Sequence, residues 1–163
     1  MYKYLILILI SVSCSSSSNL IKEVFLIPET YIGKVNIIYN IKEGAEEKYE
    51  NNVRVYVIPQ NGILLTKFKD IYGNLDQQFY LIDSNGNRKE IIAIKEESKL
   101  SDDSSKFVFR AGTVGAYGNS DDSTSLKYQE FIVSSKRNMD KYYTFEYINA
   151  FEQTVMELTK IKF

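Results

Sequence analysis

Few residues of this chain have the type and spacing that catalysis requires. The 163-residue sequence contains no histidine, which excludes Ser-His-Asp and Cys-His nucleophile systems and histidine-ligated zinc. Its single cysteine is Cys14, so neither an intrachain disulfide nor a cysteine metal cluster can form. We therefore predict that the protein is not an enzyme and that it holds no cofactor and no metal.

Two acidic pairs, Asp102-Asp103 and Asp121-Asp122, are the remaining groups that could do chemistry. Carboxylates from two loops can share a cation through oxygen ligands, and paired carboxylates can also hydrolyse glycosides. Both pairs lie in Ser-rich segments with no apolar neighbours to raise a carboxyl pKa, so solvated loop charge is the simpler interpretation. We therefore retain both acidic pairs, and Tyr117, only as candidate residues of binding loops.

Two further motifs resemble ligand sites but favour turns. Asp83-x-Asn85-x-Asn87 begins like a calcium loop, yet Arg88 occupies the sixth position and Ile94 the twelfth, where glycine and a carboxylate are needed. The glycine-rich segment 112–118 is not followed by the Gly-Lys-Ser/Thr that binds phosphate. We predict a hairpin turn for the first motif and a mobile loop for the second.

The first residues predict export. Met1-Tyr2-Lys3 is a short positive segment, and residues 4–10 form an unbroken apolar run that is far too short to cross a bilayer. The small residues Ser11-Val12-Ser13 then precede Cys14, an arrangement that resembles the lipobox of bacterial lipoproteins. Ser13 and Val12 fit that pattern, whereas Ser11 departs from the usual leucine.

We therefore predict that residues 1–13 are a lipoprotein signal peptide and that Cys14 carries acyl chains such as palmitate. Several chains would be needed for stable anchoring, since one chain is marginal. Residues 14–20 are mostly serine and predict a flexible tether. The alternatives are an ordinary signal peptide, or a buried N-terminal strand with an incidental cysteine.

The predicted location is the bacterial cell envelope, with the membrane itself as a partner through the lipid. By resemblance to lipoproteins, the lack of acidic residues just after Cys14 implies the periplasmic side of an outer membrane. In a host with a single membrane the domain would face outward. A net charge of −1 at pH 7 gives no basic excess, so we expect no nucleic-acid partner.

The rest of the chain, residues 21–163, predicts a single β-rich domain. Alternation of apolar and polar residues and turn signals indicate about seven short strands. In the segment from Tyr31 to Tyr39, the odd-numbered positions face one way and Lys34 and Asn36 face the other, as in a half-buried strand. The other expected strands are 22–27, 52–58 (with Val53, Val55 and Val57 on one face), 63–66, 78–83, 89–94, 106–110 and 128–133.

Turn chemistry supports this division. Pro59-Gln60-Asn61-Gly62 and Ser84-Asn85-Gly86-Asn87 each combine residues that favour tight turns, and Asn-Gly between two strand-like runs is a strong hairpin signal. The pattern predicts an antiparallel β-sandwich or a partly open barrel.

The C-terminal segment predicts an amphipathic helix that begins after Thr144 as N-cap. Its apolar stripe contains Tyr147, Ile148, Phe151, Val155 and Leu158. Its polar face carries too little Lys and Arg for a membrane-surface helix. We expect the helix to pack on the sheet, with Phe151 deepest.

Two stretches resemble the signatures of an uncharacterised bacterial domain family. Residues 27–33 match I-P-x-x-Y-x-G, residues 59–66 match P-x-x-G-I-x-x-T, and the block from Phe79 to Gly86 also fits. The resemblance spans residues 24–135. It implies no activity and no catalytic residue.

These observations favour an envelope lipoprotein that acts as a binding or structural module, meeting another envelope protein or a surface polymer through loops on a β-scaffold. A carboxylate-dependent hydrolase of an envelope polymer is the alternative from another class. An inhibitor or immunity lipoprotein is a third, which the sequence does not separate from the first.

Overall fold

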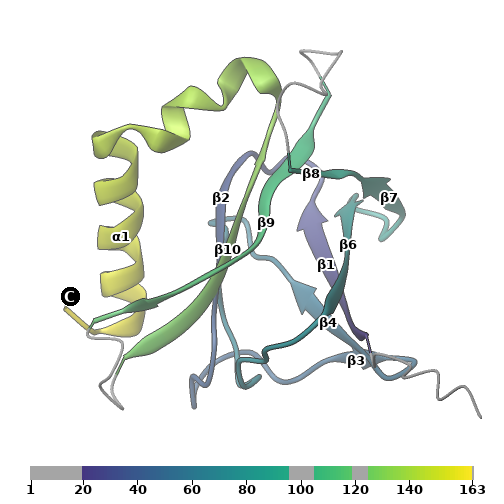
Figure 1. The fold of residues 1–163 in the computed structure, drawn as a ribbon, viewed down its shortest axis with the longest axis horizontal. Coiled ribbons are helices and arrows are strands. Elements are labelled where there is room, and N and C mark those ends of the chain that lie inside the picture. The colour runs from purple at the N-terminus through teal and green to yellow at the C-terminus, as the bar shows by residue number, and fades with distance from the viewer. Residues whose placement is uncertain (1–19, 96–104, 119–124, 163) are drawn as a thin grey trace, which may run out of the picture.

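The computed structural model describes residues 20–95, 105–118 and 125–162, and it has three layers (Figure 1). Two five-stranded sheets stack face to face, and one helix covers the outer side of the second sheet. Sheet A contains, in spatial order, β3 (Tyr49–Glu50), β4 (Val53–Val57), β1 (Ile21–Pro28), β6 (Leu75–Ile82) and β7 (Arg88–Ile91). Sheet B contains β5 (Ile63–Leu65), β2 (Gly33–Ile38), β10 (Leu126–Ser134), β9 (Phe107–Tyr117) and β8 (Ala93–Ile94). Two short 3-10 helices, η2 (Lys136–Asn138) and η3 (Asp140–Tyr143), lead into α1 (Phe145–Thr159).

The predicted mainly β fold with a C-terminal helix packed on it is confirmed, but the sheets are mixed rather than antiparallel. β1 pairs in parallel with both β4 and β6, and the pairs β2–β5 and β8–β9 are also parallel. The reason is the path of the chain, which alternates between the sheets. β2 and β5 return through sheet B, so that β1, β4 and β6 all run the same way in sheet A.

The number of strands and several of their boundaries differ from the prediction. Two strands of two residues each, β3 and β8, were not expected as separate strands, whereas the three-residue strand β5 matches the expected segment 63–66. The predicted strand 89–94 is two strands, because the chain leaves sheet A after Ile91 and joins sheet B at Ala93.

The glycine-rich segment from Gly112 was predicted to be a mobile loop, and this was wrong for its described residues. Residues 112–117 belong to β9, and residues 113–117 pair with β10. Gly115 lies opposite Tyr128, and a Cβ at Gly115 would come within 2.5 Å of the Tyr128 ring. The missing side chain therefore leaves room for a cross-strand aromatic ring, which is how strands tolerate glycine.

An aromatic cluster forms the core between the sheets. Phe25 has no exposed surface and stacks on Tyr56 and Phe79, with ring centroids 4.9 and 4.8 Å away. Phe131 from sheet B meets Phe25 edge-on at 5.4 Å, an arrangement that aromatic quadrupoles favour. This cluster joins the central strands of both sheets.

The strand around β2 shows what the sequence pattern captured and what it missed. Val35, Ile37 and Tyr39 lie in the core between the sheets, as the alternation predicted. The opposite face was expected to be solvated, yet Asn36 has no exposed surface. The strand is buried on both faces because α1 covers the outer side of sheet B.

In β4, the face that carries the three valines points away from the core between the sheets. Val53, Val55 and Val57 do share a face, but the core between the sheets contains Tyr56 and Ile58 instead. Val57 lies on the outer face of sheet A and is largely exposed.

The helix α1 follows the prediction closely. The Thr144 hydroxyl accepts a hydrogen bond from the Tyr147 N–H at 3.3 Å, which is the predicted N-cap. Phe151 and Val155 are buried against Ile38 of β2 and the ends of β9 and β10. Val155, and not Phe151, is the deepest residue, and Leu158 at the end of the predicted stripe is 41% exposed.

The predicted hairpin between residues 78 and 94 is confirmed as the antiparallel pair β6–β7. Asp83 closes its turn, since its carboxylate accepts from the backbone N–H groups of Asn85 and Asn87 and from the Asn87 side chain. These hydrogen bonds, led by that of the Asn87 side chain, hold the pKa of Asp83 below its ordinary value. The Asp83 carboxylate therefore stabilises the hairpin turn.

Candidate functional site

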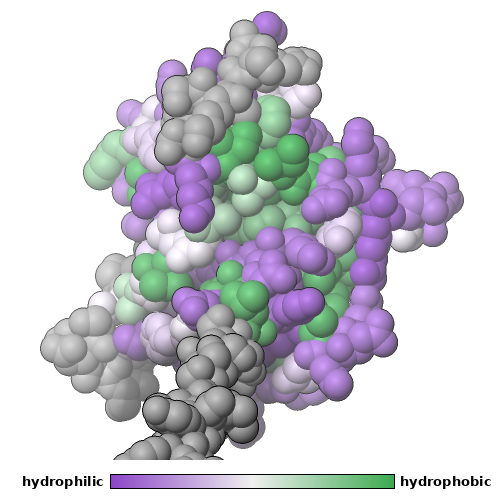
Figure 2. Space-filling model, turned by 45° about the vertical axis from the view of Figure 1, so that its right-hand side comes forward, coloured by the Kyte–Doolittle hydropathy of each residue, from purple (hydrophilic) through white to green (hydrophobic). Residues whose placement is uncertain are grey.

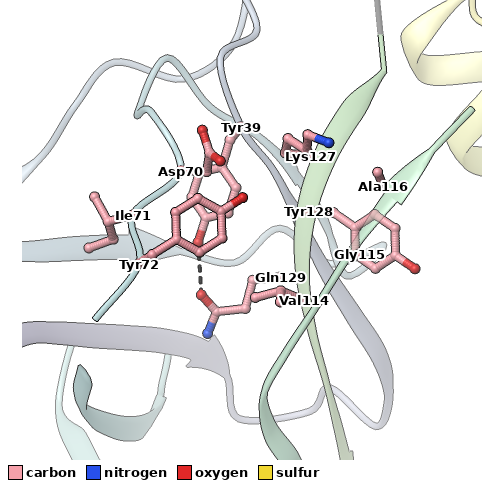
Figure 3. Close-up of a pocket in the computed structure, with 10 residues that line it drawn as sticks. All are labelled: Tyr39, Asp70, Ile71, Tyr72, Val114, Gly115, Ala116, Lys127, Tyr128 and Gln129. Atoms are coloured by element: carbon pink, nitrogen blue, oxygen red, sulfur yellow. Dashed lines mark hydrogen bonds between the residues drawn. The ribbon is translucent and has the colours of Figure 1, made fainter. Parts of the chain in front are cut away.

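A pocket of about 200 Å³ opens at the end of the sandwich where β1 enters (Figure 3). Four segments that are distant in sequence contribute to it: the residue after β2, the segment before β6, the last part of β9 and the start of β10. The residues that line it are Tyr39, Asp70, Ile71, Tyr72, Val114, Gly115, Ala116, Lys127, Tyr128 and Gln129.

Strand alternation explains why polar groups reach this pocket. Phe131 and Val133 of β10 point into the core between the sheets, so Gln129, two residues earlier, points the same way. Val114 is the cross-strand partner of Gln129 and shares its face. At this end of the sandwich the inner face of sheet B therefore changes from apolar to polar.

Gln129 and Tyr39 form the inner wall of the pocket. The Tyr39 hydroxyl donates a hydrogen bond of 2.8 Å to the Gln129 Oε1, which Figure 3 shows as a dashed line. Gln129 is 2% exposed, and among the described residues its amide nitrogen has no hydrogen-bond partner. Burial raises the pKa of Tyr39, so its hydroxyl stays protonated and remains a donor.

Sheet A contributes a polar layer behind this wall. Glu23 of β1 has no exposed surface, although it lies on the same face as Phe25. Its two carboxylate oxygens accept hydrogen bonds of 2.8 Å, one from the Tyr56 hydroxyl and one from the Gln77 amide. A buried carboxylate needs such partners, because an unpaired charge in the interior is costly.

Arg54 supplies the opposite charge near this carboxylate. Its guanidinium donates to the Lys69 carbonyl at 2.8 Å and lies 4.8 Å from the centre of the Phe68 ring. Burial, followed by the charge of Glu23, raises the pKa of Tyr56. Tyr56 therefore stays protonated and donates to Glu23 throughout the ordinary pH range.

The rim of the pocket is open. Tyr72 is 70% exposed, and the neighbouring Asp70 carboxylate raises the pKa of its hydroxyl. Val114 on the opposite side is also more than half exposed. The rim thus combines an aromatic ring, an aliphatic side chain and a carboxylate.

The buried carboxylate behind the pocket has no direct access to it. Glu23 is the one carboxylate that is buried within the described ranges, and it has no surface through which to touch a substrate. Both of its oxygens are already occupied by hydrogen bonds. Residues 20–95, 105–118 and 125–162 also contain no cluster of three acidic, histidine or cysteine side chains that could hold a metal.

A second pocket, of about 460 Å³, lies between β7 and the start of β9. Figure 2 turns this side of the molecule forward and shows apolar surface gathered in the upper part of the view. Leu81, Ile91, Ile92 and Phe107 are its apolar lining residues.

Of the residues that the sequence singled out, only Tyr117 can be placed. It lies at the end of β9 rather than in a loop, and it is buried under α1 with its ring 4.4 Å from that of Tyr128. Cys14 and the acidic pairs Asp102-Asp103 and Asp121-Asp122 are outside the described residues.

Sequence reasoning missed the residues that form the pocket and the polar layer behind it. One signal was available for Glu23, which shares the alternate positions of Phe25 and Ile27 in an otherwise apolar strand. A charged residue in such a position indicates a buried polar contact. Nothing local in the sequence marks Gln77 or Gln129.

The fold and the site together define a two-sheet β-sandwich with a small aromatic and polar pocket at one end. The chain belongs to the Family of unknown function (DUF6843), which matches residues 20–143. The predicted resemblance to an uncharacterised family is thus confirmed, and α1 lies beyond the matched residues.

The fold is shared with a known structure. It is similar to the crystal structure of a candidate lipoprotein from Bacillus anthracis, with a TM-score of 0.58 and 16% identity over 86% of this chain and 97% of that one. At this level of identity the similarity concerns the fold. A comparison with curated proteins finds no match.

Proposed function

We propose that the mature protein is a bacterial envelope lipoprotein, anchored by acyl chains on Cys14, whose sandwich acts as a binding module through the pocket at its open end. The signal-like residues 1–13 before the single cysteine support the anchor. The shared fold with a candidate lipoprotein supports the same assignment. No helix within the described residues is long and apolar enough to span a bilayer.

One observation carries the binding role: the pocket has an open rim of Tyr72, Asp70 and Val114 around an inner wall of fixed hydrogen bonds. Its volume of about 200 Å³ lies below the roughly 300–1,000 Å³ of pockets that enclose a whole small molecule. The pocket therefore fits one group of a larger envelope component, such as a protein, a surface polymer or a lipid. That the anchor lies in an outer membrane, with the domain on the periplasmic side, remains a prediction from the sequence.

We expect Cys14→Ser to abolish membrane association, because the substitution removes the sulfur that accepts the lipid. The measurement is the intact mass of protein extracted from membranes, which should correspond to a chain that begins at Cys14 and carries acyl groups. The variant should stay soluble or unprocessed. A wild-type chain that begins elsewhere and carries no lipid would refute the anchor.

We also expect a benzophenone amino acid at position 72 to form adducts with an envelope component in intact cells. The matched control places the same group at Asn85, an exposed residue at the tip of the β6–β7 hairpin. Adducts at 72 and none at 85, detected by mass spectrometry, would support the site. Equal labelling at both positions, or none at 72, would contradict a binding role for this pocket.

A further inference from the structure

We propose that the open end of the sandwich rests on the bilayer surface, with Leu20, Tyr72 and Val114 at the level of the lipid headgroups. This inference depends on the proposed anchor at Cys14 and names the partner of the pocket as a lipid surface. It is argued from the length of chain before the domain, from the place where that chain enters, and from the residues exposed there.

The chain between the anchor and the domain is short. Five residues, Ser15 to Asn19, separate Cys14 from Leu20, the first described residue. Even if fully extended, the six steps from Cys14 to Leu20 span at most about 20 Å. A domain of this size has a diameter of roughly 35 Å, given a radius of gyration of about 14 Å. The entry end of the domain is thus always held close to the bilayer.

The entry point is next to the pocket. The Ile21 N–H donates a hydrogen bond of 3.0 Å to the Asn74 carbonyl, which ties the start of β1 to the segment before β6. That segment contains the pocket residues Asp70 and Tyr72. The anchor therefore holds the end of the sandwich that contains the pocket at the membrane, and the opposite end faces away from it.

The residues exposed at this end suit a lipid interface. Leu20 is 55% and Val114 56% exposed. Tyr72 is 70% exposed, so that its ring and its polar hydroxyl are both open to solvent. A side chain with an apolar ring and a hydrated polar end is the type that concentrates at membrane–water interfaces. Single exposed apolar residues are common, but here Tyr72 and Val114 line one pocket, and Leu20 directly precedes the strand that enters beside it.

The test uses the lipidated full-length chain in vesicles of phosphatidylcholine and phosphatidylglycerol. With Cys14 blocked by lipid, a nitroxide can be attached at Tyr72→Cys, at Val114→Cys, or at the control Asn85→Cys. Asn85 follows the far end of β6, which is eight residues long and spans about 25 Å. Collision rates with oxygen and with a water-soluble nickel complex then report the depth of each label.

We expect the ratio of oxygen to nickel collisions to be several-fold higher at positions 72 and 114 than at 85. A second variant, with Leu20→Ser and a ten-residue Gly-Ser insertion after Asn19, should lower that ratio at position 114 toward the value at 85. Equal ratios at all three labels, on protein that stays bound to vesicles, would overturn the docking while leaving the anchor intact. A chain whose mass shows no lipid and which does not sediment with vesicles would overturn both.

Discussion

Phe151→Ala should destabilise the domain by about 3–5 kcal/mol, the usual cost of truncating a buried Phe. Phe151 is 8% exposed, and it packs in a cluster with Ile38 and Val155 between α1 and sheet B. Its ring also lies 5.4 Å from the Lys34 ammonium. Because a domain of this kind is stabilised by roughly 5–15 kcal/mol in total, the variant would be partly unfolded or easily denatured.

Denaturant unfolding of a chain that begins at Leu20 measures this effect. The matched control is Leu158→Ala in the same helix, which should cost about 1 kcal/mol or less because 41% of Leu158 is exposed, against 8% of Phe151. A loss below about 1 kcal/mol at Phe151 would mean that α1 contributes little to the core. The helix would then become a candidate for contact with a partner.

Tyr56→Phe should cost about 1.5–3 kcal/mol, the range for a hydrogen bond to a charged group. The substitution keeps the ring that stacks on Phe25 and removes only the hydroxyl. Glu23, which has no exposed surface, would then retain Gln77 as its hydrogen-bond donor but lose Tyr56. The cost arises mainly from the desolvated carboxylate that is left with fewer partners.

The control for this prediction is Tyr49→Phe. The Tyr49 hydroxyl donates a 3.0 Å hydrogen bond to Glu47, but this pair lies on the surface, where water replaces the lost partner. We expect a change within about 0.5 kcal/mol for the control. Equal effects of the two substitutions in denaturant unfolding would show that the carboxylate of Glu23 does not depend on Tyr56. The double variant Glu23→Gln/Tyr56→Phe should recover part of the loss, since the charge is then absent.

The two substitutions measure the contributions of two different interfaces to the stability of the domain. Phe151 probes the interface between sheet B and α1, and α1 lies outside the segment that matches the family. Tyr56 probes the polar layer between the sheets, directly behind the pocket wall. A strong effect at Tyr56 with intact adduct formation at position 72 would assign Glu23 to stability and the rim to binding.

The sequence by itself determined the class of the fold, because the signals for that class are local. Alternation along the segment from Tyr31 to Tyr39 placed the residues that fill the core. Asn85-Gly86 marked the β6–β7 hairpin, and Thr144 marked the start of α1. Each of these features depends on backbone and side-chain geometry within a few residues. The prediction of a lipid on Cys14 also depends on a local pattern, and it remains a prediction.

The tertiary structure alone decided which sheet each strand joins and what covers its faces. A period of two indicates that a strand has two faces, but it does not say that α1 buries Asn36 or that β1 runs parallel to β4 and β6. The site depends on contacts of the same long range. Glu23 meets Tyr56 and Gln77 across 33 and 54 residues, and Tyr39 meets Gln129 across 90. Such contacts form because the burial of a polar group requires a partner, and only the folded chain determines which residue is near enough to serve as one.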